Sequence, residues 1–160
     1  MEFLYNLLKT YIYNPTKTIN WDELEWFEYI KQNPDKPWDW FLISTNSNIT
    51  WEIVQNNLDK PWNNNGLSLN PNITWDIVQT NPDINWNYNM LSLNPNITWE
   101  IVQENPDIPW DYEFLSLNPN ITWDIVEENP DVPWDYIVLS KNKMTMDPFF
   151  TSRQLSYVLK

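Results

Sequence analysis

Carboxylates are the strongest candidates for acid–base or metal chemistry in this sequence, which has no histidine and no cysteine. Two pairs stand out, Glu127 with Glu128 and Asp111 with Glu113. Neighbouring residues on a helix do not face one another, and these positions change between copies of an internal repeat. No nucleophile, base and orienting group can be assembled around them. The sequence therefore predicts a protein that is not an enzyme and that holds no metal and no cofactor.

Tryptophan recurs along the chain at a fixed period. Nine of the twelve tryptophans, from Trp38 to Trp134, are separated alternately by 13 and 11 residues, so the full period is 24 residues. Such self-similarity is typical of stacked repeats, in which each unit buries its apolar face against its neighbours. We interpret the periodic rings as core residues rather than as a sugar-binding surface. The predicted stacking residues are Trp51, Trp62, Trp75, Trp86, Trp99, Trp110, Trp123 and Trp134.

Each period contains one heptad twice, as N-P-N-I-T-W-E at 94–100 and as N-P-D-I-P-W-D at 105–111. The residue before a proline is pushed out of the helical region, so each of these asparagines should end a helix. The Asn or Asp after the proline is a preferred N-cap, which would make the tryptophan the third helical residue. The predicted caps are Asp35, Asn48, Asp59, Asn72, Asp83, Asn96, Asp107, Asn120 and Asp131.

The apolar residues of each half-period recur at helical spacing, as Trp110 and Phe114 do. Each period is therefore predicted to be a hairpin of two helices, about eight and ten residues long, which stacking must hold because such short helices are unstable alone. The predicted fold class is all-α, a solenoid of short helices built from 24-residue hairpins with capping helices. A leucine-rich-repeat-like α/β solenoid stays open as the alternative, since L-S-L at 115–117 before Asn120 resembles its motif.

We predict a single repeat domain over residues 1–160. Its parts are an N-terminal capping helix (1–13), an atypical repeat (14–45), four regular 24-residue repeats (46–141) and a degenerate C-terminal cap (142–160). Terminal repeats of a solenoid are expected to be atypical. In the first regular repeat, N-N-G at 64–66 replaces larger residues, and the second helix there is expected to fray.

The tandem pattern N-P-(N/D)-I-T-W-(D/E)-I-V-Q-x-N-P-D-x-P-W resembles the Asn-rich Trp-repeat proteins of giant viruses of amoebae, the mimivirus-like group. The resemblance covers about residues 14 to 147 and is carried by a long motif that recurs several times. It implies a viral protein that acts in the host cytoplasm or is packaged in the virion. That family offers no catalytic motif to carry over.

The N-terminal sequence lacks the basic leading region, the apolar stretch and the cleavage site of a signal peptide, so we expect a protein that is not secreted. The whole sequence contains no run of about 20 apolar residues, so we expect no membrane-spanning segment. Four N-I-T sequons begin at Asn48, Asn72, Asn96 and Asn120. Such sequons mark glycosylation only in a secreted protein, and we interpret these asparagines as helix caps.

The net charge is −13, and no Lys or Arg occurs between Pro61 and Ser140. This stretch would repel nucleic acid, so we expect no direct nucleic-acid binding. Eight of its twelve acidic residues are assigned to helix starts, as caps or as charges that compensate the helix dipole. The remaining four are the candidate partner-binding residues, Glu104, Glu113, Glu127 and Glu128.

These observations favour a non-enzymatic repeat scaffold that mediates protein–protein interaction, with an unknown and preferably basic protein as its partner. Two alternatives remain open. One is a carbohydrate-binding module, and the other is an acidic mimic of nucleic acid that occupies a basic protein site. A solvated, solubilising face explains the four glutamates equally well. The sequence leaves the oligomeric state open.

Overall fold

The computed structural model describes residues 23–143, and this part of the chain forms ten short helices and no strand. The helices are α2 Glu23–Gln32, α3 Trp40–Thr45, α4 Trp51–Gln55, α5 Asn64–Leu69, α6 Trp75–Thr80, α7 Tyr88–Ser92, α8 Trp99–Glu104, α9 Tyr112–Leu115, α10 Trp123–Glu128 and α11 Tyr136–Leu139. The all-α solenoid of short helices is confirmed. The leucine-rich-repeat-like alternative is wrong for the described residues, because it requires strands.

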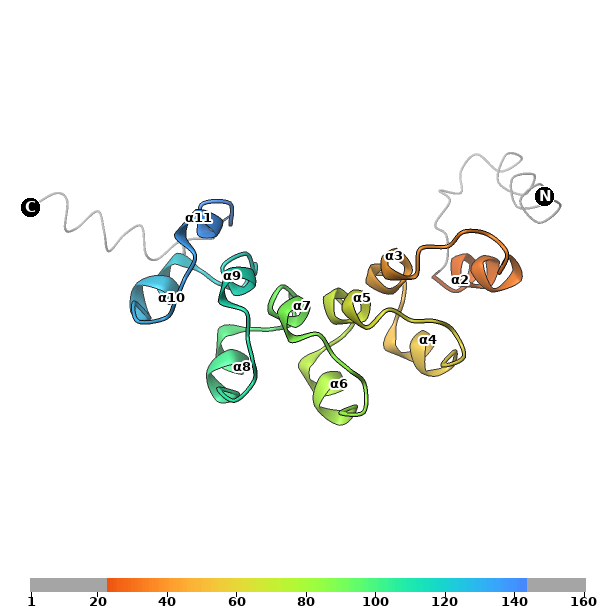
Figure 1. Ribbon diagram of the computed structural model, residues 1–160, viewed down its shortest axis with the longest axis horizontal. Helices are drawn as coiled ribbons and strands as arrows, with labels where there is room; N and C mark the ends of the chain where they lie inside the picture. The colour runs from red at the N-terminus through yellow and green to blue at the C-terminus, as the bar shows by residue number, and fades with distance from the viewer. Residues whose placement is uncertain (1–22, 144–160) are drawn as a thin grey trace, which may run out of the picture. The chain divides into compact units, whose positions relative to one another are not determined.

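The chain divides into two compact units, Met1–Trp38 and Asp39–Lys160. In the described part of the first unit, the rings of Tyr29 and Trp38 pack edge to face with centroids 6.2 Å apart. In the second unit, the first helices of the regular repeats (α4, α6, α8, α10) form one row and the second helices (α5, α7, α9, α11) form another (Figure 1). The predicted N-terminal capping helix (1–13) and residues 144–160 of the predicted C-terminal cap (142–160) lie outside the described residues.

The core of the second unit is built from the same positions in every repeat. The isoleucine of each I-T-W motif is at most 1% exposed, namely Ile49, Ile73, Ile97 and Ile121. The leucine of each second helix is also buried, namely Leu67, Leu91, Leu115 and Leu139. Helices from α3 to α11 have only four to six residues. Because such helices are unstable alone, this shared core is what keeps them helical.

The first helix of each regular repeat begins at tryptophan, and the threonine directly before it is the N-cap. In α8 the Thr98 hydroxyl oxygen accepts a hydrogen bond from the Ile101 backbone N–H. The equivalent caps are Thr50, Thr74 and Thr122. The predicted caps Asn48, Asn72, Asn96 and Asn120 are therefore wrong. They lie two residues upstream of the true caps, and the side-chain amides of Asn72, Asn96 and Asn120 bind the previous repeat instead.

The second helix of each pair is capped by the Asn or Asp that follows tryptophan. These caps are Asp39, Asn63, Asn87, Asp111 and Asp135. The predicted caps Asp35, Asp59, Asp83, Asp107 and Asp131 are wrong, because each stands four residues too early. The chain between the proline and the tryptophan is a loop, in which the Trp110 backbone N–H donates to the Ile108 carbonyl. The tryptophan thus precedes this helix instead of being its third residue, and the helices are shorter than predicted.

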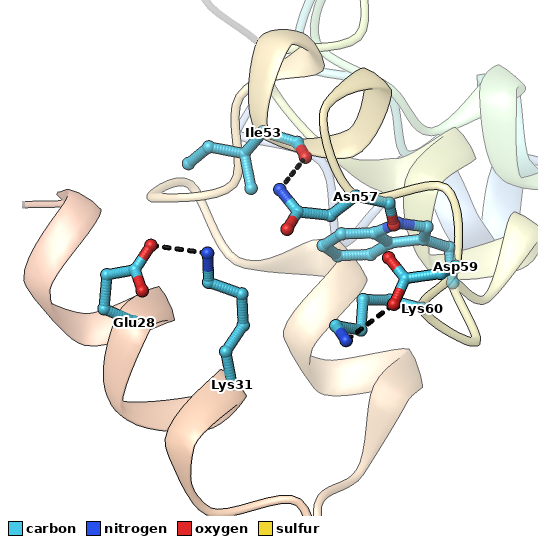
Figure 2. Close-up of polar contacts among 7 residues, drawn as sticks. Glu28, Lys31, Ile53, Asn57, Asp59 and Lys60 are labelled. Atoms are coloured by element: carbon cyan, nitrogen blue, oxygen red, sulfur yellow. Dashed lines mark hydrogen bonds and ion pairs between the residues drawn. The ribbon is translucent and has the colours of Figure 1, made fainter.

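The asparagine of the second N-P motif closes the loop between the two helices of one repeat. The Asn105 side-chain amide donates to the Ile101 carbonyl at 2.7 Å and so satisfies a free carbonyl at the end of α8. The Asn105 carbonyl accepts a hydrogen bond from the Trp110 indole at 3.0 Å. Figure 2 shows the equivalent bond from Asn57 to the Ile53 carbonyl, 2.8 Å long. This asparagine therefore acts within its own repeat.

The asparagine of the first N-P motif joins one repeat to the next. Asn94 is fully buried, and its amide nitrogen lies 2.8 Å from the Ser68 carbonyl oxygen and 3.0 Å from that of Asn70. A third carbonyl, of Ile73, is 3.3 Å away. Because the carbonyl of each such asparagine accepts from the asparagine 24 residues later, the residues form a continuous asparagine ladder. Its members with described donor bonds are Asn70, Asn94, Asn118 and Asn142.

A buried serine accompanies each step of this ladder. The serines are Ser44, Ser68, Ser92 and Ser116, all with no exposed surface. The Ser92 hydroxyl donates to the Tyr88 carbonyl and accepts from the Asp111 backbone N–H. The Ser92 carbonyl accepts from the Asn118 amide. The junction between repeats is therefore polar, but each polar group named here has a partner, as burial requires.

Gly66 allows α5 to approach α3 closely. A Cβ atom at this position would lie 2.7 Å from the Phe41 carbonyl oxygen and 2.8 Å from the Ser44 Cβ. The equivalent positions of the next two repeats carry Met90 and Phe114. The helix that the sequence expects to fray, α5, spans six residues, has an Asn63 cap and buries Gly66 against its neighbour.

The corrected caps predict different losses of stability for two aspartates of one loop. We expect Asp111→Ala to lower the free energy of unfolding by about 1 kcal/mol, because it removes the acceptor for the Phe114 N–H. Asp107→Ala, at an exposed position, should change it by less than about 0.5 kcal/mol. Urea unfolding of both variants measures the difference. A larger loss for Asp107→Ala would contradict the cap assignment.

Candidate functional site

The predicted stacking tryptophans lie between the repeats. The tryptophan of a first helix packs on the loop tryptophan of the next repeat in the pairs Trp51–Trp86, Trp75–Trp110 and Trp99–Trp134, with ring centroids 6.0, 5.5 and 5.2 Å apart. Trp62 packs edge to face with the off-period Trp40 at 5.2 Å. Trp123 is half-buried. In these pairs Trp86, Trp99, Trp110 and Trp134 are buried, whereas Trp51 and Trp75 are half-buried.

The four candidate glutamates are exposed, but they belong to different rows of helices. Glu104 is the last residue of α8, and Glu127 and Glu128 are the last two residues of α10. Glu113 lies in the first turn of α9. Negative charge near a helix N-terminus is favourable, so Glu113 has a local explanation. The structure brings the other three to the C-terminal ends of neighbouring first helices.

Three aspartates that the sequence pattern assigned to caps occur at the same edge. Asp83, Asp107 and Asp131 are exposed in the loops that follow α6, α8 and α10. None of the three side chains makes a hydrogen bond or ion pair in the described structure. The sequence offers one signal that these aspartates are not caps. A second Asn or Asp, directly after tryptophan, follows each of them and caps the helix instead. We call the resulting set the acidic rim: Asp83, Glu104, Asp107, Glu127, Glu128 and Asp131.

The acidic rim places negative charge where a helix favours positive charge. The C-terminal end of a helix carries a partial negative charge, and α8 and α10 both end in glutamate. The two ion pairs of the described residues, Lys31 with Glu28 and Lys60 with Asp59, lie outside the rim (Figure 2). The glutamates at the ends of α8 and α10 therefore oppose the helix dipole, and no Lys or Arg of the described residues pairs with a rim carboxylate. Fold stability does not account for them.

Glu100, at the opposite end of α8, shows the arrangement that stability favours. A hydrogen bond with the Thr98 side chain, helped by the backbone N–H of Glu100, lowers the pKa of this carboxyl. A lowered pKa in the folded state means that the ionised form is favoured by folding. The stabilisation is fully present above the ordinary pKa of glutamate and is lost as the pH falls through the lowered value.

The chemistry available to the rim is electrostatic attraction of cations. Within residues 23–143, no group of three or more His, Cys, Asp or Glu side chains is arranged to hold a metal ion. A cavity of about 310 Å³ lies away from the rim, beside Leu117, Pro119 and Lys141 to Lys143. Two buried polar atoms, Trp99 Nε1 and Asp124 Oδ1, have no hydrogen-bond partner among the described residues, and nothing in the structure explains them.

No family model, curated protein or solved structure matches this chain. Among the described residues, no helix has the length and apolar character needed to cross a membrane.

The two ends of α8 provide a test of the electrostatic assignment. We expect Glu104→Gln to raise the free energy of unfolding by about 0.3 kcal/mol, because it removes a charge that opposes the helix dipole. Glu100→Gln should lower it by about 0.3–1 kcal/mol. Thermal unfolding at neutral pH and low salt compares the two variants. If Glu104→Gln is the more destabilising change, the glutamate has a structural role and the rim is not a spare surface.

Proposed function

We propose that this chain is a non-enzymatic repeat scaffold that binds another protein through the acidic rim, with a basic surface on the partner. The observation that carries the proposal is that the constant residues of the repeat make internal hydrogen bonds, whereas the rim carboxylates make none in the described part of the chain. The constant asparagines, serines and loop tryptophans are occupied by internal contacts, as Asn94, Ser92 and Trp110 are. The rim carboxylates make no hydrogen bond or ion pair among the described residues, and none of them caps a helix.

Variation between repeats supports the same surface. Solenoids bind through extended faces whose residues vary while the stacking residues stay constant. At the end of the first helix, the four regular repeats carry Asn56, Thr80, Glu104 and Glu128 in turn, all exposed. Acidity therefore rises toward the C-terminal repeats. Because residues 24 apart occupy equivalent places in neighbouring repeats, Glu104 and Glu128 extend one charged edge.

The resemblance to the Asn-rich Trp-repeat proteins of giant amoebal viruses supports a second part of the proposal. On that basis the chain is a viral protein that works in the host cytoplasm or in the virion and is not secreted. Mass spectrometry of purified particles and of infected amoebae tests it. Peptides of this chain in neither sample would contradict it.

The rim is tested with two variants of equal charge. The rim variant carries Glu104→Gln, Glu127→Gln and Glu128→Gln, and the control carries Glu52→Gln, Asp76→Asn and Glu100→Gln at the other helix ends. A partner is first captured with the wild-type chain and purified. If each rim charge contributes about 0.5 kcal/mol, the rim variant should bind about tenfold more weakly. Titration calorimetry measures this at several salt concentrations.

The expected pattern is a weaker and less salt-dependent affinity for the rim variant, because screening then has fewer charges to act on. The control should bind within about twofold of wild type. Equal affinity and equal salt dependence of the wild type and the rim variant would show that the partner uses another face. Displacement of the scaffold by duplex DNA from a basic site on the partner would instead favour the nucleic-acid mimic.

A further inference from the structure

The N-I-T sequons of the repeats lie at the junctions where the repeats meet. In the folded chain, the Asn96 amide nitrogen lies 2.7 Å from the Pro71 carbonyl oxygen and 3.0 Å from that of Ile73. An unmodified carboxamide has two N–H donors, so both are used. Asn72 and Asn120 make the same pair of bonds to the carbonyls one repeat earlier, at distances from 2.6 to 2.9 Å.

The threonine of each sequon is occupied as well. The Thr98 hydroxyl oxygen accepts from the Ile101 backbone N–H and caps α8. The two residue types that define the acceptor sequence for N-glycosylation are thus both held by the fold. An enzyme that needs the asparagine amide free does not find it free in the stacked repeats.

We propose that glycosylation of Asn72, Asn96 and Asn120 and the folded repeat stack exclude each other, so that the compartment in which the chain folds decides whether the stack forms. The unfolded chain is an acceptor for an oligosaccharide carried on a lipid pyrophosphate. The asparagine nitrogen bonds to C1 of the sugar and loses one proton. The bond from C1 to the pyrophosphate oxygen breaks, and the lipid pyrophosphate leaves with the electron pair.

The modified asparagine cannot rebuild the junction. It keeps a single N–H, so one of the two carbonyls that Asn96 serves loses its donor. The saccharide also occupies the nitrogen that must come within 2.7–3.0 Å of the previous repeat. Both effects act at a junction whose remaining polar groups are buried and already paired.

Asn48 provides an internal comparison. It begins the same N-I-T sequence, but its carboxamide donates no hydrogen bond to any described residue, and only its backbone N–H is bonded, to the Asn46 side chain. A saccharide on Asn48 removes no junction bond. Asn48 should therefore accept glycosylation without loss of the stack.

The test uses the full chain with a secretory leader, translated in the presence of endoplasmic-reticulum microsomes. Thr→Asn changes remove a sequon and keep a preferred N-cap residue, so they serve as matched variants. One variant carries Thr50→Asn, Thr74→Asn and Thr122→Asn and retains only the Asn96 sequon. A second carries Thr74→Asn, Thr98→Asn and Thr122→Asn and retains only the Asn48 sequon. A third carries all four changes.

Glycan occupancy is measured by the mobility shift that an endoglycosidase removes, and folding by resistance to protease. We expect glycosylated chains of the Asn96-only variant to lose the protease resistance that the third variant, which has no sequon, retains. Glycosylated chains of the Asn48-only variant should keep it. Equal resistance of Asn96-glycosylated and unglycosylated chains would overturn the proposal.

The Asn96-only chain could fold before it is modified. A variant of it that also carries Trp99→Ala and Trp110→Ala tests this case. This double change removes two buried rings from the middle of the stack. If the double variant is glycosylated while the Asn96-only variant stays unmodified and protease-resistant, only the unfolded chain is an acceptor. That result would support mutual exclusion of glycosylation and folding. If the double variant also stays unmodified, the sequon is no acceptor and the proposal is wrong.

Discussion

A buried side-chain amide that must find acceptors one repeat away is the constraint on which this structure depends. An unpaired polar group in the interior costs about 1–3 kcal/mol, so Asn94 is tolerated only where the carbonyls of Ser68 and Asn70 reach it. Those carbonyls occur once per repeat. The amide therefore allows a single register between neighbours, and the same step is made again at Asn118.

The rings and the ladder have different tasks. A ring pair such as Trp99–Trp134 buries a large apolar area, but ring contacts tolerate small shifts. Directional hydrogen bonds do not, and buried networks in which every member is paired specify one arrangement. Because these tasks take up the constant residues, the ends of the first helices and the loops after them are left free to carry charge. The acidic rim follows from that division.

The period, the helical class and the pairing of half-repeats could be predicted from tryptophan spacing and proline punctuation. The caps could not, because each helix start offers two preferred cap residues. The first helices offer the Asn after proline and the Thr before tryptophan, and the second helices offer the Asn or Asp after proline and the one after tryptophan. The signal for the ladder is that Asn46 and Asn142 persist where Ser47 and Lys143 replace the proline. Asn57 also persists before Leu58, so persistence indicates that the asparagine side chain is needed but does not indicate which repeat it binds.

The same ambiguity decided how much of the acidic rim could be predicted. Glu104, Glu127 and Glu128 were identified because no local structure explained them. Asp107 was missed because it was assigned to a cap that Asp111 provides. Glu113 gains a local explanation once its helix is known to begin at Tyr112. The cap assignments differ because the helix starts were misplaced, and the hydrogen bonds of the folded chain correct those starts.

A comparison of two asparagines of the same motif tests most directly whether the stack depends on the asparagine ladder. Asn94 donates to carbonyls one repeat away, whereas Asn105 donates to Ile101 in its own repeat. The free energy of unfolding of Asn94→Ala and of Asn105→Ala, measured by urea titration, compares the two roles. The ladder predicts a loss on the order of 3 kcal/mol for Asn94→Ala and about 1 kcal/mol for Asn105→Ala. Equal losses would show that the stack does not depend on the ladder.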